Sequence, residues 1–130
     1  MSQQTARRGK RFADLVAEAK PQIQEVSKET LQAWLQTGVL PDGRPFTVLD
    51  VREPDEVAGG VIAKANGDQT VVIPRGQLEY AIDDVLPDQD TPIVCYCRGG
   101  NRSALAAKTL QEMGYPNVWS LAGGWRNWSA

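Results

Sequence analysis

The chain contains no histidine, only two cysteines and no long apolar run. Without histidine, the protein cannot use a Ser-His or Cys-His nucleophile pair, an imidazole general base or a histidine metal site. Cys95 and Cys97 are too few for a structural zinc site, and a disulfide between residues i and i+2 would be badly strained. We therefore expect no metal and no other cofactor, and a reducing compartment.

No segment of about 18 apolar residues is present, so the sequence predicts no membrane span. The charged N-terminal segment lacks the apolar run of a secretory signal, which makes the cytoplasm the expected location. Residues 1–20 carry five basic and two acidic side chains, although the whole chain has a formal net charge of −2. Five basic groups form a modest cluster, so we interpret them as a solvated helix face and expect no nucleic-acid partner.

The length of 130 residues fits one domain, and 42% hydrophobic with 23% charged residues is typical of a globular protein with one core. Helical spacing and capping residues predict helices at 12–19, between a Ser27 cap and Gly38, at 53–58, 74–82 and 103–113, and around 125–128. Short apolar runs predict strands at 46–49, 70–73, 93–96 and 118–119. Apolar strands that alternate with helices favour a three-layer α/β/α sandwich with a mostly parallel, roughly five-stranded central sheet.

The most informative segment follows the predicted strand at 93–96, where ligands of such folds bind. It reads Cys97, Arg98, Gly99, Gly100, Asn101, Arg102 and Ser103. Two glycines let the backbone curl so that N–H groups turn inward, and the next helix adds N–H donors and partial positive charge. Together with two arginines, these features favour a bound anion and a thiolate at Cys97. We predict Cys97 as the catalytic residue and the other six as the substrate-binding site.

A buried core thiol followed by a plain turn is the alternative interpretation of this loop. Two arginines and two glycines within five residues favour the functional interpretation instead. Cys95 lies inside the predicted strand with no charged neighbour, which favours inert packing over a role as a resolving thiol.

The Cys97 loop resembles the active-site loop of the rhodanese family, in its single-domain sulfurtransferase form. Residues 49–53 resemble the family's Asp-Val-Arg strand end, 73–76 its Ile-Pro turn, and 121–128 its C-terminal Gly-Gly-x-x-x-Trp segment. The resemblance covers roughly residues 26–130 and leaves 1–25 as a basic helical extension. Family members usually carry Gly-His-Ile where this chain has Gly60, Val61 and Ile62.

The resemblance implies a sulfurtransferase in which Cys97 takes the outer sulfur of a donor such as thiosulfate. The resulting persulfide passes this sulfur to cyanide or to a thiol, including a thiol on a protein partner. The residues themselves agree, because Arg98 and Arg102 suit a sulfur–oxygen anion and loop N–H groups suit a persulfide. Electrostatic activation of the thiol needs no histidine, and covalent ping-pong turnover is expected.

Around the loop, Asp50, Arg52 and Glu53 are interpreted as an ion pair that tethers loops rather than as substrate contacts. Trp125 and Trp128 are interpreted as core residues rather than as a platform for substrate.

Two other classes of function remain open. Cysteine phosphatases and arsenate reductases also hold a thiolate in a cradle that ends in arginine, typically as Cys-x5-Arg. Here four residues separate Cys97 from Arg102, and the tighter loop suits one sulfur atom better than a tetrahedral phosphate. The third class is a sulfur carrier or interaction module. Cys97 with both arginines counts against an inactive module, but it does not separate an enzyme from a carrier that a partner loads.

Overall fold

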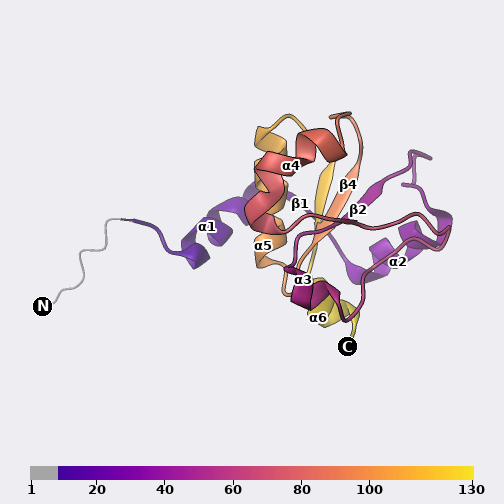
Figure 1. Ribbon diagram of the computed structural model, residues 1–130, viewed down its shortest axis with the longest axis horizontal. Coiled ribbons are helices and arrows are strands. Elements are labelled where there is room, and N and C mark those ends of the chain that lie inside the picture. Colours follow the sequence, from indigo (N-terminus) through magenta and orange to yellow (C-terminus); the bar gives the residue numbers. More distant parts are fainter. Residues whose placement is uncertain (1–8) are drawn as a thin grey trace, which may run out of the picture.

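A central sheet of five parallel strands organises the protein, in the order β1–β5–β4–β2–β3 (Figure 1). This computed structural model describes residues 9–130. The strands are Gln24–Val26 (β1), Thr47–Asp50 (β2), Val71–Val72 (β3), Ile93–Tyr96 (β4) and Val118–Leu121 (β5). All four pairs of neighbouring strands are parallel, which confirms the predicted parallel α/β sheet.

Helices cover both faces of this sheet. They are α1 (Phe12–Ala19), α2 (Lys28–Thr37), α3 (Pro54–Val57), α4 (Leu78–Val85), α5 (Asn101–Glu112) and α6 (Gly124–Trp128). One buried apolar cluster joins the sheet to α4 and α5, through side chains such as Ile82 and Leu110. The other joins the sheet to α2 through Leu31 and Leu35. The two clusters confirm the predicted sandwich, because each face of the sheet has its own apolar contact layer.

Some element boundaries differ from those that the sequence predicts. Strand β1 was not predicted, because two of its three residues, Gln24 and Glu25, are polar and exposed and only Val26 is buried. Helix α5 begins at Asn101 rather than at 103, since Gly100 adopts a positive φ of 98° and caps the helix two residues earlier. The predicted helix at 74–82 is a 3₁₀ turn (Arg75–Gln77) followed by α4.

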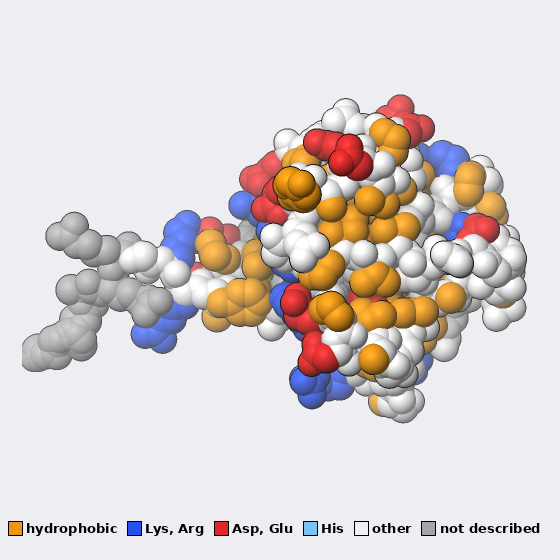
Figure 2. Space-filling model, in the orientation of Figure 1, with side chains coloured by type: hydrophobic (Ala, Val, Ile, Leu, Met, Phe, Trp, Pro, Cys, Tyr) orange, Lys and Arg blue, Asp and Glu red, His pale blue; other side chains and the backbone are white. Residues whose placement is uncertain are grey.

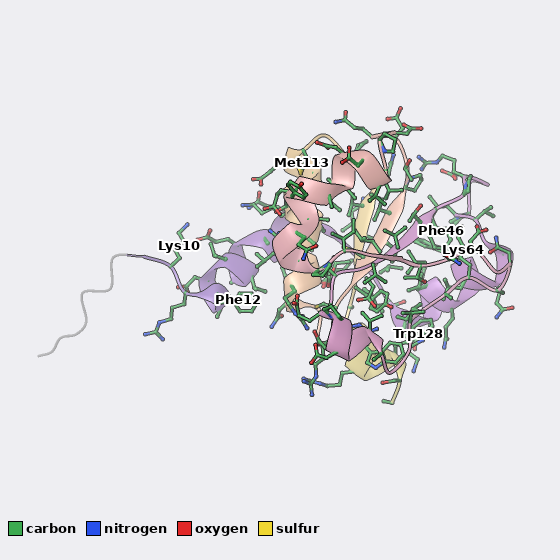
Figure 3. All side chains as sticks on the ribbon, in the orientation of Figure 1. Lys10, Phe12, Phe46, Lys64, Met113 and Trp128 are labelled. Carbon is green, nitrogen blue, oxygen red and sulfur yellow. The ribbon has the colours of Figure 1, made fainter. Side chains whose placement is uncertain are left out.

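Helix α1 lies at one side of the molecule and packs against α5 (Figure 1). Val16 and Ala19 of α1 are buried, whereas Leu15 and Phe12, which Figure 3 labels, are exposed. Residues 1–8 of the predicted basic extension lie outside the described residues. Of the helices between residues 9 and 130, none is long and apolar enough to span a bilayer.

Charge is unevenly distributed over the surface. Acidic side chains gather over α4, which carries Glu79, Asp83 and Asp84, and basic side chains flank α1, where Lys10 and Arg11 are exposed (Figure 2). The net charge of −2 therefore averages regions of opposite sign.

The carboxyl ends of β2, β4 and β5 open at one edge of the sheet. Helix α3 follows β2, the Cys97 loop follows β4, and α6 follows β5. Figure 1 shows α3 and α6 side by side at this edge. Ligands bind at this edge in open α/β sheets, so the fold brings these three segments to the expected position of a site.

Candidate active site

The sulfur of Cys97 lies inside the loop and accepts hydrogen bonds from two backbone N–H groups. Gly100 N donates to Sγ over 3.1 Å and Ser103 N over 3.3 Å. The Cys97 residue is only 1% exposed, so water contributes little to the surroundings of this sulfur. The positive φ of Gly100 is what turns its N–H inward, as the glycine pattern predicts. Gly99 has no positive φ and is exposed, so it carries no such requirement.

Further N–H groups of the loop are available as donors, among them those of Gly99, Asn101 and Arg102. Among residues 9–130, no backbone or side-chain group accepts a hydrogen bond from the N–H of Gly99, Asn101 or Arg102. Asn101 and Arg102 open α5, so their N–H groups also belong to the positive end of that helix. The loop therefore combines a thiol with free donors suited to an anion. The side chain of Asn101 is exposed and adds no contact to Cys97.

Two buried serines extend the polar contacts of Cys97 into the sheet. The Cys97 thiol lies 3.5 Å from Ser103 Oγ, and the hydroxyls of Ser103 and Ser120 share a hydrogen bond of 2.8 Å. Both serines are fully buried. Sequence reasoning did not find Ser120, because one serine in an otherwise apolar strand carries no signal of a distant partner.

The two arginines of the loop differ in their surroundings. Arg98 is exposed, and no acidic side chain among the described residues forms an ion pair with it. Arg102 instead forms a two-pronged ion pair with Glu56 of α3, with distances of 2.7 and 2.8 Å. Hydrogen bonds from Arg102 hold the pKa of Glu56 at about 2, well below its ordinary value. The sequence predicts two cations for a bound anion. In the structure Arg98 is free of an acidic partner among the described residues, whereas Glu56 neutralises Arg102.

A buried arginine fixes the segment between β2 and α3. Arg52 donates to Asp50 Oδ2 over 2.8 Å, to the carbonyl of Glu56 over 3.2 Å and to the carbonyl of Gly60 over 2.6 Å. Arg52 and Asp50 are 1% and 0% exposed, and the pair holds its position because each of the three guanidinium nitrogens donates at least one hydrogen bond. This geometry fits the predicted tether. Glu53 differs from the prediction, since it is exposed and caps α3.

Aromatic rings close the other side of the buried Arg52. Its guanidinium carbon lies 5.3 Å from the ring centre of Tyr96 and 4.6 Å from that of Trp125. A cavity of about 270 Å³ opens beside the Cys97 loop, and its lining comprises Arg52, Glu56, Arg98 and Trp125. Trp125 is thus a half-buried wall of the cavity rather than only a core residue, whereas Trp128 packs against the α2 cluster near the C-terminus (Figure 3).

The start of α6 holds the Cys97 loop from outside. Trp125 N donates to the carbonyl of Cys97, and Arg126 N donates to the carbonyl of Arg98, both over 2.8 Å. This approach needs a glycine at position 124, where φ is +58° and a Cβ would lie 2.5 Å from the carbonyl oxygen of Cys97. The Gly-Gly dipeptide before Trp125 was the sequence signal for this contact.

Cys95 lies within β4, two residues before Cys97, and its thiol contacts different groups. Its thiol donates to the carbonyls of Ser103 (3.4 Å) and Trp119 (3.3 Å) and is fully buried. Burial raises the pKa of the Cys95 thiol strongly. These features agree with inert packing. In the part of the chain that the structure describes, no group of three cysteine or acidic side chains could hold a metal ion.

Comparison with known proteins matches residues 27–130 to the rhodanese-like domain. The chain belongs to this family. It is 30% identical to a sulfurtransferase of Allochromatium vinosum over 107 residues, which cover 82% of this chain and 89% of the relative. It is 36% identical to a tRNA uridine(34) hydroxylase of Thiobacillus denitrificans over 101 residues, which cover 76% of this chain and 40% of the hydroxylase.

Solved structures with the same fold include the following two. A protein of Rhodopseudomonas palustris, described as a possible tyrosine phosphatase, has a TM-score of 0.79 and 31% identity, with 99% of this chain and 95% of that one covered. A human single-domain sulfurtransferase has a TM-score of 0.64 and 25% identity, with 81% and 94% covered. The chain spans less than two thirds of the length of several curated relatives. Family and relatives together support sulfur transfer as the general activity.

Proposed function

We propose that the protein transfers a sulfane sulfur from thiosulfate or a related donor to a thiol or cyanide through a persulfide on Cys97. The observation that carries this proposal is the N–H cradle. Two N–H groups bind the Cys97 sulfur itself, and others, among them those of Gly99, Asn101 and Arg102, have no acceptor among the described residues. In a persulfide anion, the inner sulfur accepts the hydrogen bonds from Gly100 and Ser103, and the outer sulfur can accept those of the remaining N–H groups. The loop therefore fits a persulfide better than a thiol alone.

In the first half-reaction the Cys97 thiolate attacks the outer sulfur of thiosulfate. A bond forms between the two sulfur atoms, and the bond from the outer sulfur to the sulfite sulfur breaks. Sulfite leaves with the bonding electron pair, and the negative charge of the enzyme moves to the outer sulfur of the persulfide. The N–H groups of Gly99, Asn101 and Arg102 are the loop donors that stabilise this developing charge in the proposed mechanism.

In the second half-reaction an acceptor thiolate or cyanide attacks the outer sulfur of the persulfide. The bond between the two enzyme-bound sulfurs breaks, and Cys97 returns to the thiolate. Ser103 supports both halves, because its hydroxyl can donate to the thiolate while the Ser120 hydroxyl donates to Ser103 Oγ. Small-molecule donors and acceptors, and a thiol carried by a protein partner, all fit this scheme, and the cytoplasm remains its proposed location.

A phosphatase is the second candidate, because the Rhodopseudomonas palustris neighbour is described as a possible tyrosine phosphatase. The two activities separate in one pair of assays with the full chain. We expect sulfite release from thiosulfate in the presence of cyanide, and no turnover of a small aryl phosphate. Turnover of the phosphate without sulfite release would overturn the proposal.

Cysteine variants assign the activity to one residue. Cys97→Ala is expected to abolish sulfite release, and Cys95→Ala is its matched control, because Cys95 is the other buried thiol and its sulfur accepts no N–H hydrogen bond from residues 9–130. Loss of activity in the Cys95 variant alone would contradict the assignment.

A further inference from the structure

The Glu56–Arg102 ion pair changes which charges a donor meets. Both prongs of the pair are within hydrogen-bond distance, so Arg102 directs its two terminal nitrogens at Glu56 rather than at the cavity. The cavity beside the loop is lined by Glu56 and Arg98, and Arg102 is absent from its lining. Of these two side chains only Glu56 lines the cavity, so its carboxylate, and not the guanidinium of Arg102, is part of the surface that a donor contacts there.

The formal charges of the lining side chains and of their ion-pair partners sum to a single positive charge. Arg52 is balanced by Asp50, with which it forms a fully buried pair. Arg102 is balanced by Glu56, and only Arg98 is left. Thiosulfate carries two negative charges, so one charge of this donor has no counterpart in the cavity.

One lining residue of the cavity, Trp125, is apolar. The indole of Trp125 lines the cavity and is held in place by the guanidinium of Arg52, 4.6 Å from the ring centre. Thiosulfate has no carbon to place against this ring. An organic donor does, and it gains apolar contact there.

We propose that Glu56 sets the donor charge of the site, so that monoanionic organic donors of sulfane sulfur, thiosulfonates and thiol persulfides, react in preference to dianionic thiosulfate. The proposal rests on the function proposed above, since it takes Cys97 as the sulfur acceptor. Glu56 acts in two ways, by neutralising Arg102 and by placing its own carboxylate in the cavity lining, so it is a specificity residue rather than a catalytic residue.

The chemistry for a thiosulfonate, R–SO₂–S⁻, follows the same path as for thiosulfate. The Cys97 thiolate forms a bond to the outer sulfur, and the bond between that sulfur and the sulfonyl sulfur breaks. The sulfinate R–SO₂⁻ leaves with the electron pair, and the enzyme keeps the persulfide. One negative charge stands on each reactant and on each product, so no oxidant, reductant or further reactant is needed.

Methanethiosulfonate and thiosulfate form a matched pair of probes, because they differ by one charge and one methyl group at the leaving end. The quantity to measure is the ratio of kcat/KM for methanethiosulfonate to kcat/KM for thiosulfate, with cyanide as acceptor. We expect a ratio above one for the natural chain. Glu56→Gln frees Arg102 and should lower the ratio about tenfold through a lower KM for thiosulfate, with kcat little changed.

Two further variants complete a double-mutant cycle on the Glu56–Arg102 ion pair. Arg102→Gln leaves the Glu56 carboxylate unpaired in the cavity and should raise the ratio. The double variant Glu56→Gln with Arg102→Gln replaces the ion pair by a neutral pair of similar shape, and its ratio should return to that of the natural chain. If Glu56→Gln alone fails to fold, equal ratios in Arg102→Gln and the double variant overturn the proposal.

Asp55→Asn is the matched control. Asp55 is the exposed neighbour of Glu56 on α3, and it forms no ion pair with an arginine among the described residues. Its removal changes net charge by the same amount, so the ratio should stay within about twofold of the natural value, since exposed charges are screened. An equal shift in Asp55→Asn and Glu56→Gln, or no shift in Glu56→Gln, overturns the proposal. Absence of any Cys97 persulfide from either donor would instead refute the proposed function.

Discussion

At the scale of single residues, the two adjacent glycines of the Cys97 loop have different requirements. Gly100 has a φ of +98°, and a Cβ there would lie 3.4 Å from the backbone N of Gly123. Gly99 has no positive φ, and a Cβ there would meet open space. We expect Gly99→Ala to keep most of the sulfur-transfer activity and Gly100→Ala to lose it, with a stability cost of about 1–2 kcal/mol. Sulfite release and urea unfolding measure both effects, and equal activities would contradict this geometry.

The buried Ser120 hydroxyl gives a second prediction at this scale. Because Ser120 holds Ser103 Oγ at 2.8 Å, its loss leaves the Ser103 hydroxyl free to turn away from the Cys97 sulfur. We expect Ser120→Ala to lower kcat for sulfur transfer several-fold while KM for the donor is unchanged, since Ser120 does not line the cavity. The free energy of unfolding of Ser120→Ala should be about 1 kcal/mol lower than that of the natural chain.

Ser103→Ala is the reference for this prediction, because it removes the hydroxyl that contacts the sulfur directly. Its loss of kcat should be at least as large. A Ser120 variant that falls in stability but turns over at the natural rate would assign the serine pair to packing alone.

At the scale of elements, the contact of α6 with the Cys97 loop depends on Gly124. A Cβ at this position would lie 2.5 Å from the carbonyl of Cys97 and 2.7 Å from that of Arg98, and the φ of +58° is unfavourable for alanine. We expect Gly124→Ala to separate the two segments, to abolish sulfur transfer and to lower stability by about 2–4 kcal/mol. Activity and urea unfolding report the change.

Gly76→Ala is the matched control for Gly124→Ala, because a Cβ at Gly76 would meet nothing within 4 Å and its φ is not positive. It should leave activity and stability near their natural values. An active Gly124 variant would show that α6 does not need its close contact with the loop.

The elements also show how far the sequence predicts this protein. The strand before Cys97 and the loop after it were predictable, because a continuous apolar run and a glycine pair are both local signals. Strand β1 has only Val26 buried, so it offers no such signal and depends on pairing with β5. The Glu56–Arg102 pair joins residues 46 apart in the chain, and no local pattern shows that the arginine is already neutralised. Long-range pairing is thus what sequence reasoning missed, both in the sheet and in the site.

At the scale of the whole molecule, the Glu56–Arg102 pair links stability to pH. Glu56 has a folded-state pKa of about 2 and an ordinary value of 4.5, mainly because Arg102 donates hydrogen bonds to its carboxylate. A lowered carboxyl pKa stabilises the folded state fully above the ordinary value and loses this effect as pH falls toward the folded value. We expect the natural chain to exceed Glu56→Gln in unfolding free energy by about 1–3 kcal/mol at neutral pH.

The difference between the two chains should shrink as the pH falls from about 5 toward 2, because Glu56 then binds a proton more readily in the unfolded state than in the folded state. Urea unfolding of both chains at neutral pH, pH 4 and pH 3 measures this trend. A difference that is independent of pH would mean that the ion pair does not stabilise the fold through its charge.

The most direct measurement of the central claim is the intact mass of the protein after treatment with thiosulfate and removal of excess donor. We expect the natural chain and Cys95→Ala each to gain the mass of one sulfur atom, a reducing thiol to remove it, and Cys97→Ala to gain nothing. A sulfur gain that persists in Cys97→Ala, or no gain in the natural chain, would contradict the persulfide on Cys97.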